Sequence, residues 1–165
     1  MTNPVREAIP EETARLVRSV LSADLLKPKY RTGNLAGNSA YGHCYAASEA
    51  CFYLLGGRSS PWRPRHGRDP NGIVHWWLVN IGSGDILDPT ADQYKAVDAG
   101  PPYNVARSGG FLTKEPSRRA VEIMDRVAAL NADQPPPYIY AAHRADMLSA
   151  CSSTVRTAAS WRSGG

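Results

Sequence analysis

The sequence predicts an α+β fold in which a few antiparallel strands pack against one helix. Residues 44–55 (CYAASEACFYLL) form an uninterrupted helix-forming run, and the two glycines that follow it end the helix. Residues 73–81 (IVHWWLVNI) are rich in β-branched and aromatic side chains, as strands are. A tight turn at 82–85 leads back into a second short strand at 86–88, so the two strands are expected to form a β-hairpin beside the helix.

Two further segments precede the hairpin. Apolar residues recur with helical spacing between residues 11 and 27, and Pro28 is expected to end that helix. Residues 58–72 combine prolines, glycines and several charges, which favours an exposed, irregular connection.

The remaining segments are predicted to be loops and helices. Residues 31–41 and 99–110 are expected to be loops because glycine and other turn-forming residues are frequent there. A helix is predicted over 113–130, with Thr113 as its N-cap, and another over 138–159.

The length of 165 residues is typical of one domain. We divide this single domain into an N-terminal helix (11–27), a core (38–94) and C-terminal helices (113–160). No run of about 18 apolar residues is present, and the polar N-terminus does not resemble a secretory signal. Three cysteines cannot close a disulfide framework. These features predict a cytoplasmic protein with reduced thiols and without a membrane partner.

The charge and the motifs of the sequence limit the partners and cofactors that can be expected. A formal charge of +4 and a pI near 9.1 permit an acidic partner, but aromatic residues do not alternate with a basic stripe as in many nucleic-acid-binding proteins. Nucleic acid is therefore not the favoured partner. The sequence has no P-loop, dinucleotide fingerprint or His-Glu-x-x-His motif, and its Cys and His residues lack zinc-site spacing. No cofactor and no metal are expected.

Cys44 is the first candidate for chemistry. It follows a glycine-rich loop and opens the predicted helix, where the positive end of the helix dipole favours a thiolate. A thiolate in that position is a nucleophile, although a lone cysteine is more often a core residue. Cys51 lies seven residues later among large apolar residues, and we expect it to be such a core cysteine.

His75 and Asp88 are expected to complete a site with Cys44. An imidazole inside a strand needs a polar partner, and the hairpin brings Asp88 close to His75 along one edge, with Leu78 and Asp88 facing each other. A carboxylate bound to one ring nitrogen leaves the other nitrogen facing the thiol. The alternatives are a core histidine, a turn-capping Asp88 and an orienting role for Asp92.

These residues resemble the core of transglutaminase-like and papain-like cysteine enzymes. Cys44 opens a helix, His75 begins the sequence His-Trp-Trp, and Asp88 begins Asp-Pro-Thr, in the order of the family's Cys-His-Asp triad. The segment Gly42-His43-Cys44-Tyr45 is similar to the papain-like Gly-x-Cys-aromatic motif. The resemblance covers about a third of the chain and implies a helix bearing the nucleophile on a small antiparallel sheet.

The resemblance also implies further site residues. Asn38 stands six residues before Cys44, where papain-like enzymes carry an oxyanion-binding glutamine, and its amide is expected to donate to the oxyanion. His43, Tyr45 and Trp77 adjoin the triad in sequence and are the candidate substrate-binding residues. For His43 the alternative is a cap of the helix, and for Trp77 it is core packing.

The predicted function is thiol-dependent hydrolysis or acyl transfer at an amide, peptide or isopeptide bond, with a protein or peptide as the expected substrate. The alternatives are a non-catalytic binding module on the same fold and a basic nucleic-acid-associated protein. Two basic groups bear on the second alternative, and they are interpreted either as solvated surface or as a patch for phosphates or an acidic substrate. They are Arg63, Arg65, His66 and Arg68, and Lys114, Arg118 and Arg119.

Overall fold

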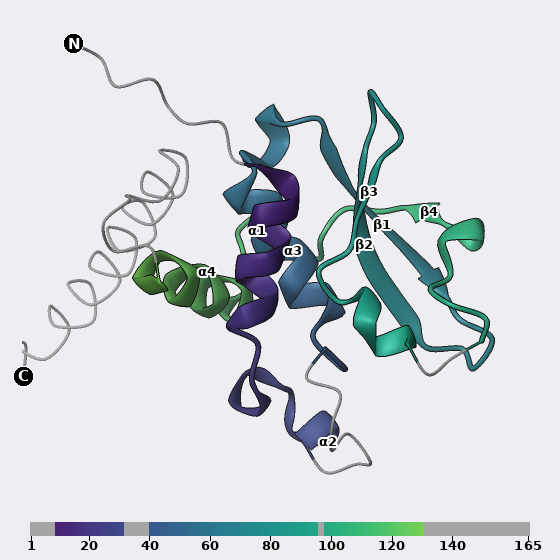
Figure 1. The fold of residues 1–165 in the computed structure, drawn as a ribbon, viewed down its shortest axis with the longest axis horizontal. Coiled ribbons are helices and arrows are strands. Elements are labelled where there is room, and N and C mark those ends of the chain that lie inside the picture. The colour runs from purple at the N-terminus through teal and green to yellow at the C-terminus, as the bar shows by residue number, and fades with distance from the viewer. Residues whose placement is uncertain (1–8, 32–39, 96–97, 131–165) are drawn as a thin grey trace, which may run out of the picture.

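The computed structural model describes residues 9–31, 40–95 and 98–130 (Figure 1). The helices are α1 (Pro10–Ser19), α2 (Pro28–Arg31), α3 (Cys44–Leu54) and α4 (Arg118–Leu130). The strands are β1 (Trp62–Arg68), β2 (Val74–Asn80), β3 (Ile86–Leu87) and β4 (Arg107–Ser108). Short 3-10 turns connect them: η1 (Ala23–Leu25), η2 (Gly57–Ser59), η3 (Ala91–Tyr94) and η4 (Tyr103–Val105).

The four strands form one antiparallel sheet in the order β3-β2-β1-β4. The predicted α+β class is therefore confirmed, as are the helix at Cys44 and the hairpin of β2 and β3. The hairpin register differs from the expectation by one residue, because Leu78 pairs with Leu87 rather than with Asp88. Asp88 consequently lies just beyond the end of the ladder.

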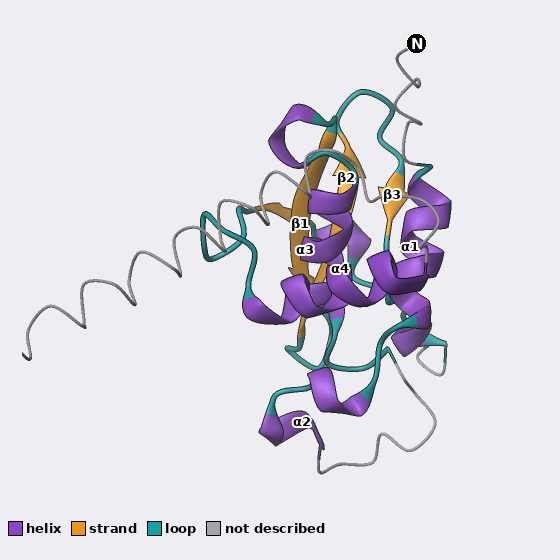
Figure 2. Ribbon diagram, turned by 90° about the vertical axis from the view of Figure 1, so that its left-hand side faces the viewer, coloured by secondary structure: helices purple, strands orange, loops and turns teal. Residues whose placement is uncertain are grey.

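Helix α3 is the centre of the molecule. Figures 1 and 2 show it between the sheet on one side and α1 and α4 on the other. Every residue from Ala46 to Leu54 is buried, as expected for a helix that contacts neighbours all round. Its small residues Ala46, Ala47 and Ala50 belong to the same buried core as Leu78 of β2 and Ile123 of α4, and their size permits close packing of the helix.

Residues 91–95 and 98–105 cover the opposite face of the sheet. Trp77 is fully buried there and packs against Tyr103 of η4, with ring centroids 5.1 Å apart. Gly67 of β1 permits this close cover, because a Cβ at Gly67 would lie 2.8 Å from the carbonyl oxygen of Pro102. The sheet therefore has a helical layer on one face and a layer of turns on the other.

The prediction of an irregular connection over residues 58–72 is wrong for its middle part. Strand β1 lies there and pairs along its whole length with β2, from Trp62 opposite Asn80 to Arg68 opposite Val74. Strand β4 pairs only with Arg65 and His66, so the other edge of β1 is unpaired near Pro64 within the described residues. Proline is tolerated where its nitrogen faces such an unpaired edge.

The two flanking helices are shorter than predicted. Helix α1 ends at Ser19, and the chain continues into the separate turn η1, where Arg126 of α4 donates to the Ser22 hydroxyl at 2.6 Å. Helix α4 begins at Arg118 instead of Thr113. Ser117 caps it, because the Ala120 amide donates to the Ser117 hydroxyl at 3.3 Å.

Some expectations concern other parts of the chain. The predicted helix over 138–159 and most of the predicted loop over 31–41 lie outside the described residues. Within the described part, no helix has both the length and the apolar composition needed to cross a membrane.

Candidate functional site

The start of α3 places Cys44 beside the start of β2. Gly42 precedes it with φ of 76°, a left-handed conformation that favours glycine, and a Cβ there would lie 2.9 Å from Leu26. The Cys44 Sγ lies 3.8 Å from the carbonyl oxygen of Val74, and one turn later the Ser48 hydroxyl donates to Trp76 O at 3.0 Å. These two contacts fix α3 along β2, so the partly buried thiol lies next to the strand residue that precedes His75.

His75 and Asp88 form a buried pair. Their Nε2 and Oδ2 atoms are 2.6 Å apart, and the side chains are 0% and 3% exposed. The Trp77 ring stacks on the imidazole with centroids 5.8 Å apart, and Tyr94 meets it edge-on at 5.0 Å. The ring is therefore held between two aromatic side chains while its Nε2 faces the carboxylate.

Asp88 is fixed by neighbours of its own. Its Oδ1 accepts from the Thr90 amide at 2.9 Å and from the Thr90 hydroxyl at 3.1 Å, and its Oδ2 also accepts from the Tyr103 hydroxyl at 2.8 Å. Burial and the Asp88 charge raise the pKa of Tyr103, so its phenol stays protonated as a donor. The carboxylate is thus held in one orientation toward His75.

This environment favours the charged form of His75. Burial alone would lower its pKa, but hydrogen bonds with Asp88 and with Cys44, together with the charges of both, raise the pKa of His75 to about 9. Cys44, His75 and Asp88 therefore interact as one group, in which an imidazolium lies between a carboxylate and a thiol. Such a group is the general form of an activated nucleophile.

Gln93 of η3 is a site residue that the sequence did not identify. Its amide nitrogen contacts Nδ1 of His75, the ring nitrogen that Asp88 does not bind. In the neutral tautomer with hydrogen on Nε2, the Nδ1 lone pair accepts from this amide. Gln93 and the thiol therefore compete for the same ring nitrogen.

Two of the three predicted substrate-binding residues are buried. His43 is 2% exposed and is the N-terminal neighbour of α3, without a capping hydrogen bond from its side chain. Burial first, and then the charges of Arg119 and Arg18, lower its pKa to about 4. Trp77 is 0% exposed. These burials are at odds with direct substrate contact, because both side chains are covered by the protein itself.

Tyr45 remains at the surface of the site. It is partly exposed, packs edge-on against Trp76 at 5.1 Å and against Phe111 at 5.5 Å, and its hydroxyl accepts from the Leu112 amide at 2.8 Å. Trp76 is also partly exposed and points to the α3 side of β2, opposite to Trp77. Tyr45 and Trp76 thus offer an aromatic surface beside Cys44.

Of the remaining predicted residues, Asp92 and Cys51 do not take part in the His75–Asp88 pair. Asp92 pairs with Arg18 at 3.0 Å and with Lys95 at 3.2 Å, so Asp88 and not Asp92 is the carboxylate at His75. Asn38, the predicted oxyanion donor, lies outside the described residues. Cys51 is fully buried in the core, and burial raises the pKa of its thiol.

The structure does not suggest a metal centre within its described ranges. No group of three His, Cys, Asp or Glu side chains there has the arrangement that could hold a metal ion. The reactive groups that the site brings together are a thiol, an imidazole and a carboxylate.

Comparison with known proteins found no match. No protein-family model matches the sequence, and neither the curated proteins nor the solved structures give a significant match. Function is therefore inferred from the geometry of the site.

Proposed function

We propose that the protein is a thiol-dependent hydrolase or acyltransferase that acts on an amide or peptide bond. Cys44 is the nucleophile, His75 is the general base and acid, and Asp88 orients and charges His75. One observation carries the proposal: the buried His75–Asp88 pair, 2.6 Å apart, lies beside a cysteine at the start of a helix. The order and spacing of the three residues also support a transglutaminase-like or papain-like core.

The first half-reaction forms an acyl-enzyme. The proton of the Cys44 thiol resides on Nδ1 of His75 in a thiolate–imidazolium pair, and the thiolate attacks the substrate carbonyl carbon to form a C–S bond. The carbonyl oxygen becomes an oxyanion, which the Cys44 amide at the start of α3 can bind, since the first N–H groups of a helix lack partners within it. The C–N bond then breaks, and the leaving amine takes the proton from His75.

The second half-reaction releases the acyl group. Water or an acceptor amine attacks the thioester carbonyl and gives a proton to His75. The C–S bond breaks, the sulfur recovers its proton, and the product is a carboxylic acid or a new amide. Throughout, Asp88 stabilises the imidazolium through Nε2.

The surface beside Cys44 is consistent with an extended substrate. Tyr45 and Trp76 form a partly exposed aromatic surface next to Cys44, and an extended peptide chain could lie across it. We therefore favour a protein or peptide substrate over a small amide.

Intact-mass analysis with a panel of acyl donors tests the proposal. The protein is incubated with peptide thioesters and amides of varied sequence, and each mass increase is mapped to a residue. The proposal predicts an acyl group on Cys44 that disappears in Cys44→Ala and is strongly reduced in His75→Ala. Acylation of other residues alone, or equal acylation of Cys44 in His75→Ala, would reject it.

A further inference from the structure

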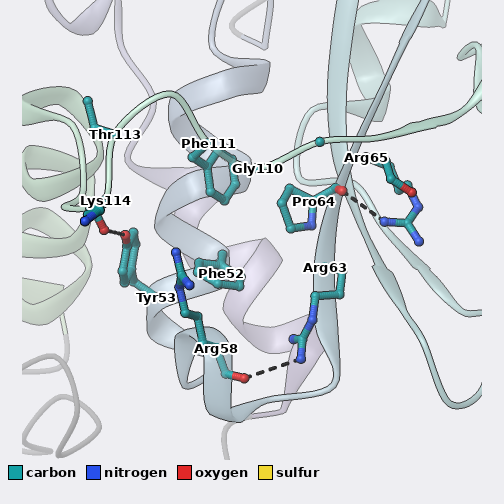
Figure 3. A pocket seen from close by; sticks show the side chains of 12 residues that line it. Phe52, Tyr53, Arg58, Arg63, Pro64, Arg65, Gly110, Phe111, Thr113 and Lys114 are labelled. Atoms are coloured by element: carbon teal, nitrogen blue, oxygen red, sulfur yellow. Dashed lines mark hydrogen bonds between the residues drawn. The ribbon is translucent and has the colours of Figure 1, made fainter.

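A pocket lies at the end of α3 opposite to Cys44 (Figure 3). Its walls are the last turn of α3, the first half of β1 and the segment from β4 to α4, and its volume is about 590 Å³. Its lining residues are Phe52, Tyr53, Arg58, Arg63, Pro64, Arg65, Ser108, Gly109, Gly110, Phe111, Thr113 and Lys114. Tyr53 lies nine positions after Cys44, about 13 Å along α3, so the α3 wall of this pocket lies away from the Cys44 thiol.

The pocket is positively charged. Four of its lining residues are cationic and none is acidic. Figure 3 shows the Arg58 side chain rising between Tyr53 and Phe52, and Arg63 pointing from β1 toward the same space, while Arg65 extends from the other side of the strand. Lys114 belongs to the opposite wall. An anion in this space would therefore meet cations from two walls.

The guanidinium of Arg63 is fixed in position by backbone carbonyl oxygens. Its Nη1 donates to the carbonyl oxygens of Ser60 at 2.6 Å and Trp62 at 2.7 Å, and its Nη2 reaches the carbonyl oxygen of Arg58 at 3.4 Å. Carbonyl oxygens fix the guanidinium without neutralising its charge. A pre-positioned guanidinium loses little side-chain entropy when it binds phosphate or carboxylate oxygens.

Three aromatic side chains, Phe52, Tyr53 and Phe111, also line the pocket. The ring centroids of Phe111 and Phe52 are 5.5 Å apart, and Phe111 also stacks on Trp76 at 5.8 Å. The Tyr53 hydroxyl donates to Lys114 O at 2.9 Å, which ties the segment before α4 to the end of α3. The pocket thus combines a cationic rim with an apolar base.

We propose that this pocket binds a small anionic ligand that carries an aromatic group, of the nucleoside-phosphate class. The volume falls in the usual range of small-molecule sites. The phosphate oxygens bind Arg58, Arg63 and Lys114, and the planar base packs against Phe52 and Phe111. The site does not use Cys44, His75 or Asp88, although its residue Phe111 also packs against Tyr45 and Trp76.

Calorimetric titration of the full-length protein tests this site with three probes: ADP, adenosine and pyrophosphate. We expect ADP to bind more tightly than either part alone, and its affinity to fall as salt increases. Arg58→Ala should weaken ADP binding at least about tenfold, because a charge-assisted contact is lost. Arg68→Ala is the matched control, since Arg68 lies on the same strand as Arg63, is exposed and does not line the pocket. Cys44→Ser should bind ADP like the wild type.

The outcomes separate the alternatives. Circular dichroism of each variant checks that the fold is retained. Arg63→Lys tests Arg63 in a variant that keeps the positive charge but lacks the forked guanidinium. Binding of pyrophosphate as tightly as ADP would overturn the aromatic part of the proposal. Absence of ADP binding, or equal weakening by Arg58→Ala and Arg68→Ala, would overturn the site itself. Preferential binding of an acidic peptide over ADP would assign the pocket to a different class of ligand and would also overturn the proposal.

Discussion

The carboxylate of Asp88 controls the charge of His75, and its removal should have a measurable energetic effect. His75 is fully buried, yet its pKa is raised from 6.5 to about 9. Burial acts in the opposite direction, so Asp88 and Cys44 must more than offset it. A rise of this size corresponds to about 3 kcal/mol of stabilisation of the imidazolium.

Asp88→Asn removes the charge but keeps the shape. The single amide oxygen can still accept from Thr90 or from Tyr103, though not from both, whereas burial remains and lowers the pKa of His75 toward or below 6.5. An amide also does not stabilise the imidazolium that pairs with the thiolate, and it can select the wrong tautomer. We therefore expect the acylation rate of Cys44 at neutral pH to fall at least about a hundredfold.

The same substitution should change the pH dependence of stability. Because the pKa of His75 is raised in the folded protein, its contribution is fully present below pH 6.5 and is lost as pH rises toward 9. Urea unfolding of the wild type should show up to about 3 kcal/mol of this loss, and Asp88→Asn should lack it. Asp85→Asn, an exposed carboxylate in the hairpin turn, is the control. Asp85→Asn should behave like the wild type. If Asp88→Asn also kept the wild-type decrease in unfolding free energy at alkaline pH and the wild-type acylation rate, Asp88 would not charge His75.

Three further predictions concern single residues. Cys44→Ala should abolish acylation with little change in the free energy of unfolding, whereas Cys51→Ala should keep acylation and cost about 1 kcal/mol for a small core cavity; denaturant titration and intact mass distinguish them. Burial and the charges of two arginines lower the pKa of His43 to about 4. The free energy of unfolding should therefore decrease by up to about 3 kcal/mol as pH falls from 6.5 to 4. Acid unfolding curves of His43→Gln should not show this decrease. Gln93→Ala frees Nδ1 of His75 for the thiol and should raise the alkylation rate of Cys44 about fivefold at neutral pH; a slower rate would mean that Gln93 supports the charged ring.

The parts of the fold that were predictable have local sequence signals. The helix at Cys44 ends where Gly56 adopts φ of 104°, and the hairpin follows its turn residues. The proximity of His75 and Asp88 followed from the hairpin alone. The register was harder, because a shift of one residue in a two-residue strand changes little in the hydrophobic pattern.

The parts that were missed depend on contacts between distant segments. Strand β1 has the composition of a loop, and it is extended because β2 pairs along its whole length. Tyr103 follows Asp88 by fifteen residues, and it reaches the carboxylate because η4 packs on Trp77. Gln93 lies five residues after Asp88, and its polarity was the only available signal, since the 3-10 turn that aims it at His75 is not evident from sequence.

The alkylation rate of Cys44 as a function of pH reports directly on whether His75 and Asp88 activate the thiol. A small electrophile is added, and peptide mass spectrometry follows each cysteine separately. We expect that Cys44 reacts rapidly at neutral pH, that His75→Ala slows it at least about a hundredfold, and that buried Cys51 reacts only on unfolding. A Cys44 that reacts like a simple thiol at every pH, with the same rate in His75→Ala, would contradict the proposed activation.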